Sequence, residues 1–133
     1  MIEPIVKRCA GLDVHKMKVT VTVHIEQEDG SVEEETREYK TFRNHRRQLA
    51  RWLKRLGIEL AVMESTGNYW RSIHDTLDAE DIAVWVVNAR HVKQVPGRKT
   101  DVVDSRCLAV LGRMGLIRPS FVPSKDFREL RLI

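Results

Sequence analysis

Four acidic residues, Asp13, Glu64, Asp101 and Asp104, have side chains and positions suited to metal-dependent chemistry. Asp13 and Glu64 each follow a short apolar stretch, so we expect each at the end of a buried strand. Asp101 and Asp104 are three residues apart at the expected start of a helix, where they would share one face. If these elements are neighbours, the carboxylates converge, and a divalent cation relieves their mutual repulsion. The pattern therefore predicts metal-assisted phosphodiester chemistry on nucleic acid.

The expected ion is Mg²⁺, with Mn²⁺ as its substitute. Mg²⁺ prefers oxygen ligands and keeps several waters, so a few carboxylates are enough to hold it. Two such ions about 4 Å apart can activate a water or hydroxyl and stabilise the leaving oxygen. The histidines show no paired spacing of the kind that zinc sites use. Each carboxylate also has a simpler interpretation: Asp101 and Asp104 can stabilise a helix N-terminus capped by Thr100, and Glu64 can be a solvated strand end.

The composition is that of one soluble globular domain with an uneven charge distribution. The 133 residues are 42% hydrophobic and 32% charged, with a net charge of +4. Basic residues gather in 43–55 and 90–99, which favours either a polyanionic partner or a solvated surface. The two cysteines form no framework, so we expect a reduced, cytoplasmic setting. No apolar run is long enough to span a membrane, and the N-terminal residues lack the core of a signal peptide.

The first third of the chain predicts three strands. A short apolar strand ends at Asp13, and residues 18–25 then alternate between aliphatic and polar side chains. Asp29 and Gly30 form a hairpin turn signal, after which a strand returns over 32–42. Three successive glutamates near its start are typical of a solvated sheet edge.

The remaining sequence alternates between helices and strands. Asn44 is the expected N-cap of a helix that ends before Gly57, with apolar residues at helical spacing. The tryptophans are expected in the core. The elements expected after Gly57 are a strand over 60–64, a helix over 69–79, a strand over 82–87, a basic loop over 88–100 and a helix over 100–115. The inward residues of that last helix are expected to be Val103, Cys107, Leu111 and Met114.

This order predicts an α/β domain with a mixed five-stranded sheet flanked by helices. Three successive strands followed by strand–helix alternation match the ribonuclease H-like fold by analogy. In that fold the first and fourth strands are adjacent, so Asp13 and Glu64 would meet at one edge of the sheet.

Several motifs in order resemble the DEDD transposases of the insertion sequence 110 family, which include the Piv-type DNA invertases. The similarity runs from about residue 10 to the end. The motifs are Gly11–Lys16, Met63–Trp70, Asn88–Arg90 and Lys99–Asp104. The resemblance implies a RuvC-like catalytic domain, an acidic tetrad of Asp13, Glu64, Asp101 and Asp104, and Mg²⁺ or Mn²⁺ as the ion. It also implies DNA strand cleavage and exchange guided by a structured RNA, with a homo-oligomer formed by the full-length protein.

Residues in or beside these motifs are candidates for contact with nucleic acid. They are Lys16, Asn68, Arg90, Lys93, Arg98 and Lys99. The family has a second, C-terminal domain that carries a serine nucleophile. We accordingly expect residues 1–118 to be the catalytic domain and 119–133 to begin a helix, capped by Ser124, that leads toward that domain. Recombination is expected to need more than this chain alone. Ser105 stands where the family commonly has alanine, and its small hydroxyl is expected to be tolerated.

Two alternatives remain open. A Holliday-junction resolvase uses the same fold and a similar acidic cluster, and would cleave four-way junctions without further domains. A nucleic-acid-binding module without turnover would use the basic helix and loop, and its affinity would fall steeply with salt. An actin-like ATPase is disfavoured, because the chain has no glycine-rich phosphate loops.

Overall fold

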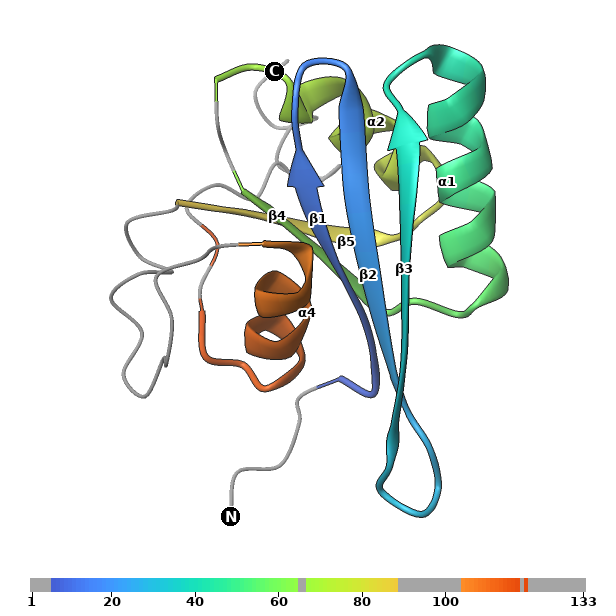
Figure 1. Cartoon of the computed structure of the whole chain (residues 1–133), viewed down its shortest axis with the longest axis vertical. Coiled ribbons are helices and arrows are strands. Elements are labelled where there is room, and N and C mark those ends of the chain that lie inside the picture. Colours follow the sequence, from blue (N-terminus) through green and yellow to red (C-terminus); the bar gives the residue numbers. More distant parts are fainter. Residues whose placement is uncertain (1–5, 65–66, 89–103, 118, 120–133) are drawn as a thin grey trace, which may run out of the picture.

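The computed structural model describes residues 6–64, 67–88, 104–117 and 119. Its centre is a five-stranded mixed sheet in the order β3-β2-β1-β4-β5 (Figure 1). The strands are β1 (Arg8–Val14), β2 (Lys18–Glu26), β3 (Val32–Lys40), β4 (Leu60–Glu64) and β5 (Ala83–Val87). β1, β2 and β3 pair antiparallel, whereas β4 pairs parallel with both β1 and β5. The predicted sheet is confirmed, and β3 and β5 end within two residues of their expected limits.

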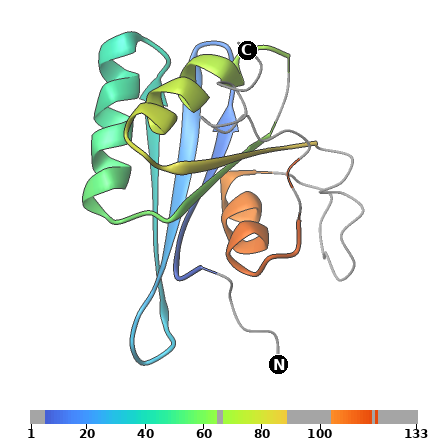
Figure 2. The same ribbon diagram turned by 180° about the vertical axis from the view of Figure 1, so that it is seen from behind.

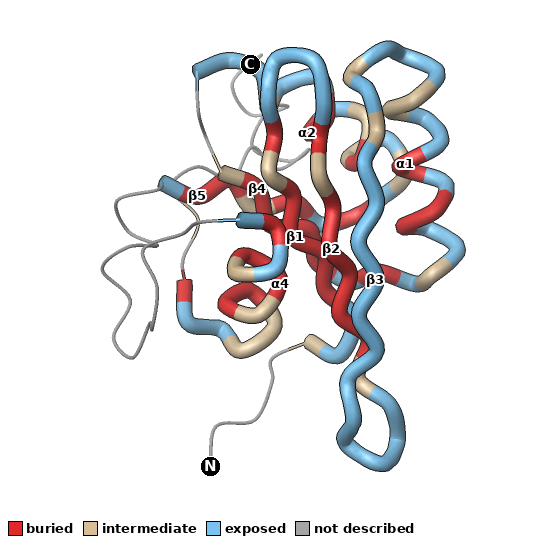
Figure 3. Tube along the Cα trace, in the orientation of Figure 1, coloured by how far each residue is buried: buried red, intermediate tan, exposed pale blue. Residues whose placement is uncertain are grey.

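Helices cover both faces of this sheet. On one side lie α1 (Arg43–Arg55) and α2 (Trp70–Ala79), and on the other lies α4 (Ser105–Arg113) (Figures 1 and 2). Side chains alternate between the faces of each strand, so the interior divides into two apolar clusters. Leu12 and Met63 pack toward α1 and α2, while Cys9 and Val62 pack toward α4. Both layers are needed, since the central strands are buried on both faces (Figure 3).

Helix α1 has the apolar face that its spacing predicts. Its buried residues include Leu49, Trp52 and Leu53. The helix begins earlier than expected, because Phe42, not Asn44, is the N-cap and makes no side-chain capping bond. The strand-to-helix turn is fixed by Thr41, whose hydroxyl donates to the Lys16 carbonyl over 2.9 Å. The predicted end at Gly57 is confirmed by its φ of 68°.

Helix α4 begins at Ser105, five residues later than predicted. Asp104 has an extended backbone and is the N-cap, so it lies before the helix in which it was expected. Asp101, the other member of the expected pair, lies outside the described residues. In this arrangement the Asp104 carboxylate accepts the hydrogen bond of the Cys107 amide. In a helix that began earlier, a backbone carbonyl would accept it instead. The buried residues of α4 are Ser105, Leu108, Ala109, Leu111 and Gly112. Of the expected inward residues only Leu111 is buried; Cys107 and Met114 are half-buried, and Val103 lies outside the described residues.

Strand β2 is buried on its polar face as well as its apolar one. Thr22 and His24 alternate with the valines that face α1, and both are buried beneath α4. Trp52 is buried and Trp70 and Trp85 pack against the two clusters, which confirms that the tryptophans belong to the core. In the described part of the chain, no helix has the length and apolar character needed to cross a membrane.

Candidate active site

Asp13 and Glu64 come together at the carboxyl ends of two parallel strands. β1 and β4 pair in register as far as Leu12 and Met63. One further step along both strands sets Asp13 beside Glu64, on strands that lie about 4.8 Å apart. Their side chains share the face of Gly11 and Val62, which is the face covered by α4. Both residues are half-buried, so solvent and ligands can reach them.

Gly11 allows α4 to approach this pair of strands closely. A Cβ at Gly11 would lie 2.0 Å from the Ser105 carbonyl oxygen and 2.5 Å from the Ala109 nitrogen. Any side chain would therefore push the first turn of α4 away from β1. Since Asp104 directly precedes Ser105, the close approach also brings Asp104 to the carboxyl-terminal half of β1. Glycine is therefore required at position 11, two residues before Asp13, if α4 is to pack against this part of β1.

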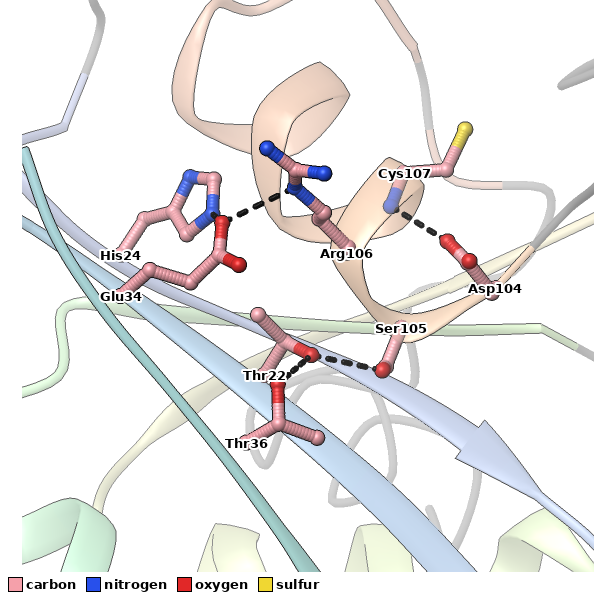
Figure 4. A network of polar contacts seen from close by, with 8 residues as sticks. All are labelled: Thr22, His24, Glu34, Thr36, Asp104, Ser105, Arg106 and Cys107. Atoms are coloured by element: carbon pink, nitrogen blue, oxygen red, sulfur yellow. Dashed lines mark hydrogen bonds and ion pairs between the residues drawn. The ribbon is translucent and has the colours of Figure 1, made fainter. Parts of the chain in front are cut away.

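Asp104 caps the helix that carries it. Its Oδ1 accepts a hydrogen bond from the Cys107 backbone N–H over 2.8 Å (Figure 4). The simpler interpretation of the acidic pair, stabilisation of a helix N-terminus, therefore holds for Asp104. That role uses one carboxylate oxygen. The second oxygen makes no hydrogen bond to any residue that the structure describes, and it remains available as a ligand.

Asp13 has a neighbour that the sequence pattern did not single out. The Asp13 Oδ2 and the His15 Nε2 are 3.2 Å apart, with 25% and 53% of the two side chains exposed. His15 lies one residue beyond the end of β1 and two residues after Asp13, so continuing the strand's alternation would put the two side chains on one side of the sheet. Strand periodicity could therefore have identified it.

The described carboxylates suit a hard cation, but they do not form a closed cage. Among residues 6–64, 67–88, 104–117 and 119, no three side chains of His, Cys, Asp or Glu group closely enough to hold a metal. Asp101 lies outside the described residues. Mg²⁺ is commonly held by one or two carboxylates together with water and substrate phosphates. The adjacent Asp13 and Glu64 have the donor chemistry that such an ion requires.

A polar network attaches the first turn of α4 to β2 and β3 (Figure 4). The Thr22 hydroxyl lies 2.7 Å from that of Ser105 and 2.8 Å from that of Thr36. Ser105 is buried, and Thr22 is the hydrogen-bond partner of its hydroxyl. The serine, which was expected only to be tolerated in place of alanine, therefore makes a structural contact.

A second attachment runs through Glu34. Its Oε2 lies 2.7 Å from the His24 Nε2 and accepts a hydrogen bond from the Arg106 Nε over 3.0 Å (Figure 4). The two attachments fix the helix turn that follows Asp104.

The predicted nucleic-acid contacts are only partly described. Lys16 lies in the exposed turn between β1 and β2, close in sequence to Asp13. Asn68 is exposed just before α2, where its carbonyl accepts a hydrogen bond from the Arg71 N–H over 3.3 Å. Both follow closely in sequence the strand ends that carry Asp13 and Glu64. Arg90, Lys93, Arg98 and Lys99 lie outside the described residues.

Comparison with known proteins gives a family match and a fold match. The family model for DEDD transposases of the insertion sequence 110 type, described as a transposase, matches residues 10–133. No match was found among curated proteins. The structure is similar to that of Thermus thermophilus RuvC, with 15% identity, coverage of 87% of this chain and 85% of RuvC, and a TM-score of 0.52. For T. thermophilus RuvC in complex with a Holliday junction substrate the identity is 15%, the coverages are 90% and 85%, and the TM-score is 0.50. These likenesses confirm the ribonuclease H-like, RuvC-like fold.

Proposed function

The chain belongs to the DEDD transposases of the insertion sequence 110 family, and we propose that it is the metal-dependent catalytic domain of a recombinase that cleaves and exchanges DNA strands. The observation that carries this proposal is the adjacency of Asp13 and Glu64 at the ends of β1 and β4. Two neighbouring carboxylates at the carboxyl edge of a sheet are a common setting for a phosphoryl-transfer ion. Residues 1–118 are the proposed catalytic unit.

Asp13 and Glu64 are the adjacent described residues that would hold the ion, with Asp104 and Asp101 proposed as the further ligands that would complete the site around it. Bound Mg²⁺ or Mn²⁺ would supply charge neutralisation and activation of a water or hydroxyl. Asp104 can serve while it caps α4, because its cap bond occupies one oxygen only. The helix N-terminus beside it contributes further positive potential for a phosphate.

Other residues of the chain would orient the substrate. His15 lies 3.2 Å from Asp13 and can hold that carboxylate in place by donating a hydrogen bond. Lys16 and Asn68 are exposed beside the two strand ends and can contact phosphate or sugar groups. Arg90, Lys93, Arg98 and Lys99 are proposed as further backbone contacts. DNA is the proposed substrate, with a structured guide RNA and assembly with further copies as additional parts of the proposal.

The test is metal-dependent nicking of supercoiled plasmid by the purified chain. We expect nicking in Mn²⁺ that is lost in EDTA and reduced at least 100-fold in Asp13→Asn and Glu64→Gln. Asp29→Asn is the matched control, since Asp29 is an exposed carboxylate in the hairpin turn that bonds only Ser31 among the described residues. Equal nicking by Asp13→Asn and wild type would contradict the proposal.

A second substrate separates the proposal from its alternatives. Symmetric cleavage of a four-way junction in preference to linear duplex would favour a junction resolvase. Binding of nucleic acid with no strand breakage in wild type would favour a module without turnover.

A further inference from the structure

Helix α1 presents a continuous row of basic side chains to solvent. Arg43, Arg47, Arg51 and Lys54 are all exposed, and their spacing puts them within about 80° of arc on one helix face. We refer to these four residues as the basic stripe. At about 1.5 Å of rise per residue, the stripe is roughly 16 Å long. It lies on the face of the sheet opposite α4, as Figures 1 and 2 show, and so opposite the face of Asp13 and Glu64.

The stripe lacks the acidic residues that normally balance a solvated helix. Residues 43–55 contain no Asp or Glu. Arg43 and Arg47, and likewise Arg47 and Arg51, are like-charged pairs four residues apart, and each such pair destabilises a helix by about 0.2–0.5 kcal/mol. Arg43 also lies in the first turn, where positive charge opposes the helix dipole. A surface that only needed to be soluble would gain stability from interspersed glutamates.

Partners within the described structure leave this charge largely unbalanced. The Lys54 Nζ donates to the Glu80 backbone carbonyl over 2.8 Å, which leaves its charge uncompensated. Arg43, Arg47 and Arg51 form no ion pair with any other described residue. The positive potential of α1 therefore projects into solvent, where it attracts a polyanion.

A groove adjoins the basic stripe. A cavity of about 530 Å³ lies between α1 and α2, with Arg43, Arg46 and Arg47 on one wall and Ser72 and Thr76 on the other. Two acidic residues, Asp75 and Glu80, also line it, against three arginines. The Asp75 Oδ1 lies 3.0 Å from the His74 Nδ1. Guanidinium groups and a serine hydroxyl are donors that phosphate oxygens accept. The groove is thus suited to a phosphate group at the N-terminal end of the stripe.

We propose that the basic stripe and this groove bind the phosphate backbone of a nucleic-acid duplex that is separate from the strand cleaved at Asp13 and Glu64. The inference extends the proposed function by adding a second nucleic-acid site, and it requires no metal. A duplex carries one charge per about 1.7 Å of axis, so the stripe spans the phosphates of roughly five base pairs. The two sites lie on opposite faces of the sheet, so they can be occupied together.

The test measures the salt dependence of binding in EDTA. Fluorescence anisotropy would follow 20-base-pair DNA and RNA duplexes of one sequence, bound by wild type, Arg47→Gln, Arg51→Gln and the double variant. We expect each substitution to weaken binding several-fold and to reduce the slope of log K against log salt by about 1. A larger loss with one duplex than with the other would identify which nucleic acid the stripe holds.

Lys7→Gln is the matched control. Lys7 is exposed and lies outside the stripe, and its substitution removes one positive charge, as each stripe substitution does. The melting temperatures of the stripe variants should equal or exceed that of wild type, since a like-charge repulsion is removed. Slopes equal to that of Lys7→Gln, or no duplex binding by wild type at low salt, would overturn the inference. The two proposals are tested separately, because stripe binding is measured in EDTA and read from the basic variants, whereas the catalytic proposal is read from metal-dependent nicking.

Discussion

The hydroxyl oxygens of Thr22 and Ser105 lie 2.7 Å apart, although 83 residues separate them in the sequence. This contact joins the centre of β2 to the first buried residue of α4. Asp104 directly precedes Ser105, whose carbonyl packs on Gly11 of β1, so the contact also fixes where Asp104 lies along that strand. A hydroxyl pair in the interior thus sets the position of a candidate metal ligand.

Removing this contact should loosen the start of α4. Ser105→Ala leaves the Thr22 hydroxyl with Thr36 as its remaining described partner, and we expect a loss of about 1 kcal/mol in the free energy of unfolding. Hydrogen exchange of the Cys107 amide, which Asp104 caps, should also accelerate. Chemical denaturation and exchange spectroscopy would measure both effects. Ser72→Ala, an exposed serine of α2, is the control. Unchanged stability and exchange in Ser105→Ala would show that the hydroxyl contact is dispensable.

Gly11 should tolerate no side chain. Gly11→Ala places a Cβ 2.0 Å from the Ser105 carbonyl, so α4 must move or β1 must distort. We expect destabilisation of about 2–3 kcal/mol, measured by urea denaturation. Gly30→Ala is a useful comparison, because a Cβ there meets open space and the cost comes only from its φ of +87°. A smaller loss at Gly11 than at Gly30 would contradict the close packing of α4 on β1.

The two partners of Glu34 should contribute unequally. The side chain of His24 is 5% exposed, whereas that of Arg106 is 70% exposed, so solvent screens the arginine pair far more. Double-mutant cycles with Glu34→Gln would measure both coupling energies. We expect about 1–2 kcal/mol for His24→Gln with Glu34→Gln, and less than about 0.5 kcal/mol for Arg106→Gln. Equal coupling would mean that burial does not govern this network.

Asp81 has a backbone conformation that glycine adopts more easily. It follows the C-terminus of α2 with a φ of 60°, and its N–H donates to the Asp78 carbonyl over 3.0 Å. Asp81→Gly should therefore raise the free energy of unfolding by about 0.5 kcal/mol. Asp78→Gly, inside the same helix, should lower it by about 1 kcal/mol. Thermal denaturation of both variants would show opposite shifts, and a loss of stability in each would contradict this account of the helix end.

Local patterns were enough to predict the sheet. The alternation of β2, the turn at Gly30 and the apolar stretch that ends at Glu64 each depend on neighbouring residues, and each was confirmed. The parallel pairing of β1 with β4 followed from fold order, so the adjacency of Asp13 and Glu64 could be predicted. The acidic cluster beyond this pair stays a prediction.

The features that local sequence patterns did not predict depend on contacts between residues far apart in the sequence or on capping. The burial of Thr22 and His24 depends on α4, which comes from a far later part of the chain. Asp104 was expected inside a helix, but an aspartate gains more by capping the N-terminus than by occupying the first turn. Helix α1 starts early, at Arg43, directly after a turn in which Thr41 bonds the Lys16 carbonyl, and no local helix signal reveals that bond.

The central claim is that Asp13 belongs to a site for a divalent cation, and calorimetric titration of Mn²⁺ tests it most directly. Wild type, Asp13→Asn and the control Asp29→Asn would be titrated at physiological salt. We expect wild type and Asp29→Asn to bind Mn²⁺ with equal affinity and Asp13→Asn to lose binding, because the mutation removes a charged oxygen ligand beside Glu64. Binding that is unchanged in Asp13→Asn, or absent from wild type, would contradict the account.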